Sequence, residues 1–296
     1  RNQMINSYDA QYKKILHRIM KEGIDCDDRT GVGTRKVFDA NINVDLRHDV
    51  EGEHLLPALT LRKIFHRVAF EEWLWMMSGS TNANLLKEKN IHIWDGNSSR
   101  EYLDAIGMSH LQEGYLGNSY GHQFRNFNGH YDQLSEVIRG IKDNPNGRRH
   151  YISLWNPSDL DKTALPSCHL AYSFMVTGEH LNLKVIIRSN DWILGQPTNA
   201  MFSTFFLTFV ADLLGYKVGN LSMSITDAHI YQNHLEAAQE LLDRDPMAMA
   251  TFKWKTPQRG SVFDIDASLA SMGWDDVNVT YQSHPAIARE KLQMAA

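Results

Sequence analysis

The chain has 296 residues, 43% hydrophobic and 22% charged, enough to bury a sizeable core. Its net charge of −5 argues against a general nucleic-acid-binding protein, so we expect no DNA binding. No stretch approaches the ~20 apolar residues that a membrane span needs. With only two cysteines and no apolar signal-peptide core, we expect a cytoplasmic protein, in the host cytoplasm if a phage encodes it.

Hydrophobic periodicity in the first half predicts helices separated by short strands and turns. In chain order we expect a helix over residues 8–22, a turn-rich loop over 27–34, a strand over 36–45, a buried helix over 61–78, a helix beginning at 80–82, a short apolar run over 91–94 before a polar turn at 95–100, a glycine-punctuated aromatic segment over 113–127 and a helix over 132–142.

The second half predicts more strands around one long apolar helix. We expect strands over residues 151–155, 170–176 and 181–187, a helix over 198–216, a strand over 220–226 ended by Asp227, His229 and Tyr231, a helix over 233–243 and a looser tail after 245. No repeat or linker interrupts the pattern. Residues 1–296 are therefore expected to form a single α+β domain.

Cys168 is the first candidate for chemistry. An isolated cysteine is usually a small buried hydrophobe. A reactive cysteine needs electropositive surroundings that hold it as a thiolate. The arginines at turns and strand edges could converge on it: Arg29, Arg148, Arg149 and Arg188. Cys26 lies in an acidic run, so we interpret it as structural.

The same arginines suggest an anion site, although each alone could be a surface charge. Several guanidinium groups together would hold a phosphate dianion. The Asn199 amide offers a donor and an acceptor side by side, which suits a uracil-type ring edge. His229 and Tyr231 could hold a sugar hydroxyl, and the spacing of His229 and His234 does not favour a metal site.

Seven stretches together resemble the thymidylate synthase family over nearly the whole chain. They cover residues 27–34 (DDRTGVGT), 71–82 (EEWLWMMSGSTN), 93–107 (IWDGNSSREYLDAIG), 116–125 (LGNSYGHQFR), 147–169 (GRRHYISLWNPSDLDKTALPSCH), 188–199 (RSNDWILGQPTN) and 226–234 (TDAHIYQNH). The resemblance implies a large mixed β-sheet covered by helices, with a sheet face used for homodimerisation. It also implies two ligands, dUMP and a reduced folate, 5,10-methylenetetrahydrofolate, and no metal.

The resemblance implies a role for each matching residue. Cys168 would add to C6 of the pyrimidine. The nucleotide would be bound by Arg29, Arg188, Ser189, Asn199, His229 and Tyr231, with Arg148 and Arg149 lent by the partner subunit. Glu72 would run a proton network at O4 with Tyr120 and His169, and Asp191 and Asn199 are also expected to serve catalysis. The folate side would be lined by Ile93, Trp94, Asp191, Leu194, Gly195 and Thr198, with residues 294–296, ending in Ala296, folding over the closed site.

Five departures from the family pattern bear on the product. They are Thr198 for phenylalanine, Ser167 for proline, Asn118-Ser119 for Pro-Val, Thr226 for glycine and Thr60-Leu61-Arg62 for Thr-Thr-Lys. Small polar residues near the methylene would favour its capture by water, as in a pyrimidine hydroxymethylase used in phage DNA modification. We therefore expect a hydroxymethylase. Its substrate is expected to be dUMP, which makes it a deoxyuridylate hydroxymethylase, because Asn199 favours dUMP over dCMP. The alternatives are thymidylate synthase, which Trp94 and the C-terminal segment favour, and, more remotely, a non-catalytic folate- or RNA-binding paralogue.

Overall fold

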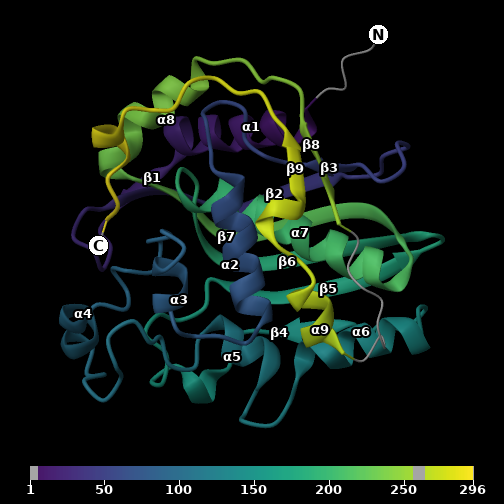
Figure 1. Cartoon of the computed structure of the whole chain (residues 1–296). Coiled ribbons are helices and arrows are strands. Elements are labelled where there is room, and N and C mark those ends of the chain that lie inside the picture. Colours follow the sequence, from purple (N-terminus) through teal and green to yellow (C-terminus); the bar gives the residue numbers. More distant parts are fainter. Residues whose placement is uncertain (1–5, 256–263, 296) are drawn as a thin grey trace.

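The structure, a computed structural model, describes residues 6–255 and 264–295 and has a six-stranded sheet within them (Figure 1). Its order is β1 (Ile24–Cys26), β2 (Thr34–Asp45), β7 (Lys217–Tyr231), β6 (His180–Asp191), β5 (His169–Thr177) and β4 (Tyr151–Ser153). β6 and β7 run parallel, and the other neighbouring strands run antiparallel. This arrangement confirms the predicted α+β class and the large mixed sheet.

One apolar helix fills the space over the centre of this sheet. α7 (Gly195–Leu214) packs on β6 and β7, and α2 (His66–Met77) packs on α7 (Figure 1). Nearly every side chain of α7 is buried, including Phe205, Phe206 and Phe209. A helix that is apolar all round needs such two-sided cover. Its first turn therefore lies at a fixed place beside the ends of β6 and β7.

Further helices cover the edges of the sheet. α1 (Ser7–Glu22) packs on β2, and α8 (Leu235–Leu242) packs on α1. The remaining helices are α3 (Asn84–Lys87), α4 (Arg100–Ala105), α5 (Tyr120–Arg125), α6 (Gln133–Asp143), α9 (Ile265–Ala270) and 3-10 turns at Pro157–Asp159, Gln232–His234, Trp274–Asp276 and Arg289–Leu292. Among the described residues, no helix has the length and apolarity to cross a membrane.

The predicted loose tail after residue 245 is wrong. β8 (Ala250–Trp254) pairs with β3 (His54–Leu56) and with β9 (Val277–Thr280), which gives a three-stranded sheet in the described ranges. Phe252 and Trp254 pack against Phe205 of α7. These short strands come from distant parts of the chain, so their pairing depends on tertiary contacts that local sequence patterns do not report.

The helix predicted over 61–78 begins later, at His66 of α2. The carbonyl of Leu61 accepts a hydrogen bond from Arg244 Nη1 at 2.8 Å, and the carbonyl of Arg62 accepts one from the Tyr281 hydroxyl at 3.0 Å. Side chains from the C-terminal half thus bind carbonyls that a first helical turn would use. The strand predicted over 220–226 is longer, so His229 and Tyr231 lie within β7.

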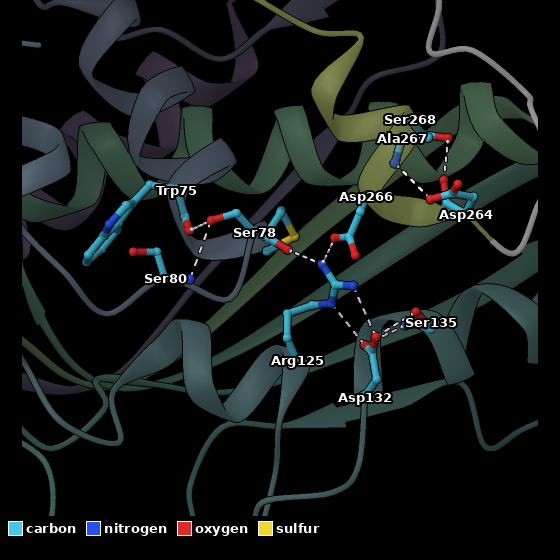
Figure 2. Close-up of polar contacts among 11 residues, drawn as sticks. Trp75, Ser78, Ser80, Arg125, Asp132, Ser135, Asp264, Asp266, Ala267 and Ser268 are labelled. Carbon is cyan, nitrogen blue, oxygen red and sulfur yellow. Dashed lines mark hydrogen bonds and ion pairs between the residues drawn. The ribbon is translucent and has the colours of Figure 1, made fainter.

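Arg125, at the end of α5, ties three elements together (Figure 2). Its guanidinium group binds the Asp132 carboxylate through Nε and Nη2, both at 3.1 Å. Its Nη1 donates to Asp266 Oδ1 on α9 and to the carbonyl of Met77, each at 2.7 Å. α9 is thereby joined to the end of α2 and to the start of α6.

Candidate active site

A pocket of about 300 Å³ lies at the carboxyl ends of the parallel strands β6 and β7. Asp191 ends β6, Tyr231 ends β7 and Gly195 begins α7. The lining residues are Arg29, Glu72, Ile93, Asn97, Asp191, Leu194, Gly195, Thr198, Asn199, Tyr231, Met294 and Ala295. Eleven of them were expected at a site from the sequence, and the structure brings them together from six separate segments.

The turn between β6 and α7 is fixed by Asp191. Its Oδ1 accepts hydrogen bonds from the backbone N–H groups of Ile193 and Leu194, at 3.0 and 3.1 Å. An aspartate that binds the backbone two and three residues ahead stabilises a tight turn. Thr198 and Asn199 therefore stand in the first turns of α7, facing the pocket.

The C-terminal segment forms another wall of the pocket. Met294 and Ala295 line it together with Arg29 from the loop after β1, and the yellow C-terminal segment lies beside that loop in Figure 1. Asn233 Nδ2 and His234 Nε2 both lie within hydrogen-bond distance of the Gln293 carbonyl, at 2.9 and 2.6 Å. Ala296, expected over the site, lies outside the described residues.

Cys168 lies just before β5, beside the cationic side of the pocket. Its backbone N–H donates to the Tyr120 hydroxyl at 2.6 Å, and Arg188 Nη2 lies 3.9 Å from its Sγ. Burial raises the pKa of the Cys168 thiol, and the charges of Arg188 and Arg29 oppose this only in part. Burial disfavours the charged form of the thiol more strongly than the two arginines favour it, and the expectation that arginines hold a thiolate stays a prediction.

Arg188 is held rigidly against the backbone around Cys168. Its Nε donates to the Ser167 carbonyl at 2.8 Å and its Nη2 to the Pro166 carbonyl at 3.1 Å, while the guanidinium group lies 5.5 Å from the Trp155 ring centroid. Among the described residues, its Nη1 makes no protein hydrogen bond. Ser189 follows it on β6, half-buried. Arg188 can therefore offer a free N–H pair to an anion without rearrangement.

Arg148 and Arg149 do not join this cluster within the chain. Both are exposed and precede β4. Neither makes a hydrogen bond or ion pair with residues that the structure describes. Of the four arginines expected around the thiol, Arg29 and Arg188 therefore act on Cys168 from within one chain.

Glu72 places a buried carboxyl group in the pocket. It projects from α2, and Trp94 Nε1 donates to its Oε2 at 3.0 Å. Burial raises the pKa of Glu72 to about 7, although the Trp94 hydrogen bond opposes the shift. A carboxyl group with that pKa can both give and take a proton near neutral pH.

Tyr120 and His169 lie behind Cys168 and Glu72. The Tyr120 hydroxyl accepts from the backbone N–H of His169 at 3.3 Å as well as from that of Cys168. The Nδ1 of His169 is 2.6 Å from the Tyr172 hydroxyl. Burial lowers the pKa of His169 to about 4, and the nearby Asn199 amide opposes the shift only partly. His169 is thus a neutral imidazole near pH 7.

Asn199 is held by Asn190, a residue to which the sequence analysis assigned no role. Asn190 Nδ2 donates to Asn199 Oδ1 at 2.9 Å, and Asn190 is only 3% exposed. Asn97 is a second omission: it lines the pocket from the polar turn after Trp94. The first lies inside a strand and the second in a turn of common polar residues, so neither had a distinctive sequence signal.

His229 and Tyr231 lie one after the other along the same face of β7. The His229 Nδ1 lies 3.1 Å from Asp227 Oδ1, and the two rings stand edge to face with centroids 5.4 Å apart. Burial raises the pKa of Tyr231 to about 12, so its hydroxyl keeps its proton. Both side chains can hydrogen-bond a neutral hydroxyl group.

Four of the five departures that suggested capture by water are not among the residues that line the pocket. The Ser167 hydroxyl donates to the Leu154 carbonyl at 3.4 Å, and Thr226 is exposed on β7. Thr60 binds Asp9 and the Met247 backbone. Of the five departures, Thr198 alone lines the pocket described here. The expectation that the other positions surround a methylene group stays a prediction. No group of three or more metal-binding side chains occurs within the described ranges.

Comparisons with known proteins agree with the resemblance seen in the sequence. The family model described as thymidylate synthase matches residues 10–295. The chain is 38% identical to a bifunctional dihydrofolate reductase-thymidylate synthase of Zea mays over 94% of its length, covering 53% of that protein. It is 38% identical to the protein of the same name from Leishmania major over 98% of its length, covering 56%. The chain thus spans about half the length of these curated relatives.

Proposed function

The chain belongs to the thymidylate synthase family, and from this premise we propose that it transfers a one-carbon unit from 5,10-methylenetetrahydrofolate to C5 of dUMP. The observation that carries the proposal is the position of Cys168. Its sulfur lies 3.9 Å from a guanidinium nitrogen of Arg188 and within the field of Arg29, which lines the pocket.

The proposed chemistry begins with addition of Cys168 Sγ to C6 of the pyrimidine. This addition makes C5 carbanion-like and therefore able to take up an electrophilic carbon. Because burial keeps the free thiol protonated, the proton must leave as the sulfur attacks. Glu72, with its pKa near 7, is the group suited to exchange a proton with O4 as charge develops there.

The nucleotide is proposed to bind with its phosphate at Arg29, Arg188 and Ser189. The uncommitted Nη1 of Arg188 supports this assignment. Asn199 would read the base, and His229 with Tyr231 would bind the 3′-hydroxyl group. The neutral His169 and the Tyr120 hydroxyl would order the groups around O4.

The opposite wall fits a folate. Ile93, Leu194 and Gly195 present apolar surface, and the Asp191 carboxylate can accept N–H groups of a pteridine ring. Trp94 holds Glu72 on this side. When bound, the folate supplies the one-carbon unit. Met294 and Ala295, with Ala296 beyond them, would exclude water from the loaded site.

For the product, we propose reductive methylation, giving dTMP and dihydrofolate. The four departures that lie outside the pocket give no support to capture by water, and the curated relatives carry the name thymidylate synthase. Hydroxymethylation remains a second candidate because Thr198 does line the pocket and offers a hydroxyl group that could hold a water. That outcome would give 5-hydroxymethyl-dUMP and tetrahydrofolate.

Product analysis tests both outcomes. Purified protein incubated with dUMP and 5,10-methylenetetrahydrofolate is expected to form dTMP and dihydrofolate in equal amounts. Formation of 5-hydroxymethyl-dUMP instead would establish the second candidate. Incubation with 5-fluoro-dUMP and the folate should leave a covalent adduct on Cys168, detected by mass spectrometry. A protein without product and without adduct would be a non-catalytic paralogue.

We also propose a homodimer in which Arg148 and Arg149 complete the partner's phosphate site. Both arginines are exposed and lack partners in the described part of the chain. They precede β4, whose Tyr151 is 50% exposed on the open face of the sheet. Met175 of β5 is 61% exposed and lies on the same face. Tyr151 pairs with Ser173, and Ser173 and Met175, two residues apart on one strand, point to the same side of the sheet.

A further inference from the structure

A series of buried hydrogen bonds runs from α1 to the pocket. The Tyr8 hydroxyl donates to Gln196 Oε1 at 3.1 Å, Gln196 Nε2 donates to Asn190 Oδ1 at 2.8 Å, and Asn190 Nδ2 donates to Asn199 Oδ1 at 2.9 Å. Tyr8 and Gln196 are fully buried and Asn190 is 3% exposed. Asn199, at the other end, lines the pocket. We call Tyr8, Gln196 and Asn190 the amide relay.

The relay has a direction. In each step an N–H or O–H group points toward Asn199, and the next amide oxygen receives it. Asn199 Oδ1 is therefore turned to Asn190, and its Nδ2 is the donor that remains for the pocket side. An amide turned by 180° would set Asn199 Nδ2 against Asn190 Nδ2, two donors without an acceptor, which is costly in a buried site.

This direction matters because an amide can read two different pyrimidines. Uracil presents a carbonyl acceptor at position 4 and an N–H donor at position 3, whereas cytosine presents an amino donor and a bare nitrogen acceptor. When Asn199 points its Nδ2 toward position 4 and the second lone pair of its Oδ1 toward position 3, the amide matches uracil. The reversed amide matches cytosine equally well. A freely turning asparagine therefore does not discriminate between the rings.

We propose that Tyr8, Gln196 and Asn190 are positioning residues that make the site selective for uracil over cytosine nucleotides. The inference rests on the proposed function, since it takes Asn199 as the reader of the base. Tyr8 is the decisive end of the relay. If the amides of Gln196, Asn190 and Asn199 turned together, the Tyr8 hydroxyl would have to accept instead of donate. Its proton would then lose the one acceptor that it has among the described residues.

Tyr8→Phe is the cleanest test, because it removes one oxygen far from the substrate and keeps the buried ring. Dissociation constants and kcat/KM are measured for dUMP and dCMP on the full-length protein. The preference for dUMP is expected to fall about tenfold, the scale of one well-placed hydrogen bond. The loss should come from weaker dUMP binding and stronger dCMP binding, with kcat for dUMP little changed. Asn190→Leu should lower the preference at least as much.

Thr208→Val is the matched control, because it removes a fully buried hydroxyl from the same helix, α7, where it bonds only the Thr204 carbonyl. It should lower stability and leave the preference unchanged. A Tyr8→Phe preference within twofold of wild type overturns the relay, whether or not Asn190→Leu folds. If the wild type forms neither product nor a Cys168 adduct, the proposed function fails; if it is active but binds dUMP no better than dCMP, only the relay fails, so the two failures are distinguishable.

Discussion

Glu72 illustrates how burial sets the chemistry of a single residue. Its pKa is raised to about 7 because the carboxyl group is buried away from water, although the Trp94 hydrogen bond opposes the shift. The folded state therefore favours the protonated acid. By linkage, this contribution to the free energy of unfolding is fully present below the unfolded pKa near 4.5 and is lost as the pH rises through 7.

Glu72→Gln keeps the shape and the acceptor for Trp94 but cannot ionise. Between pH 4.5 and pH 8 the wild type should lose about 3 kcal/mol of unfolding free energy relative to this variant, since one pKa unit is worth about 1.4 kcal/mol. Urea denaturation of both proteins across that range measures the difference. Asp9, whose pKa is raised to about 6, titrates in both proteins and cancels. A difference that does not vary with pH would contradict the raised pKa.

Several residues of the candidate site stand out in the sequence because their chemistry is rare in their context. A carboxylate in an apolar helix, a lone Cys-His pair and clustered arginines each depart from what a structural role requires. Asn190 and Gln196 could not be predicted in this way. Each looks like an ordinary polar residue until β6 and α7 are packed together and leave both side chains without water.

At the level of elements, hydrophobic periodicity predicted the helices and strands whose formation depends on local sequence. The helix over 8–22 and α1 differ by one residue at the start, because Asn6 caps the helix by accepting from the Asp9 backbone N–H at 3.0 Å. The second sheet escaped prediction, since β3, β8 and β9 have five residues or fewer and pair across the chain. Short strands carry too few alternations to distinguish from loops.

We expect the Arg125 side chain to contribute strongly to holding α9 against the ends of α2 and α6. Arg125→Lys keeps a positive charge but cannot bind Asp132 through two nitrogens while also reaching Asp266 and the Met77 carbonyl. The side chain is 12% exposed, so the lost bonds are poorly replaced by water. We expect a loss of about 2 kcal/mol in unfolding free energy and faster amide exchange in α9.

Arg47→Lys is the control for this prediction. Arg47 is 57% exposed and pairs with Asp45 on the surface. The same chemical change there should leave the free energy of unfolding nearly unchanged, because surface ion pairs are screened by water. Equal losses in the two variants, or unchanged exchange in α9, would show that Arg125 does not hold this helix.

At the scale of the whole molecule, one chain supplies the side of the candidate site around Cys168, whereas two of the arginines expected at the phosphate lie elsewhere. Cys168, Asn199 and Glu72 are assembled by one chain, whereas Arg148 and Arg149 stand exposed at the edge strand β4. In a two-fold symmetric dimer, the surface beside one β4 would meet the same surface of the partner. Each phosphate site would then draw its arginines from both chains.

Mixing two inactive variants tests this arrangement. Cys168→Ala lacks the nucleophile, and the double variant Arg148→Ala/Arg149→Ala lacks the donated cations, so each homodimer should be nearly inactive. In a mixed dimer, one site has both defects and the other has none. After subunit exchange at equal concentration, about one quarter of wild-type activity should return, since half of the dimers are mixed and each has one intact site. A monomer in sedimentation experiments, or no recovery despite exchange, would show that the arginines act within their own chain.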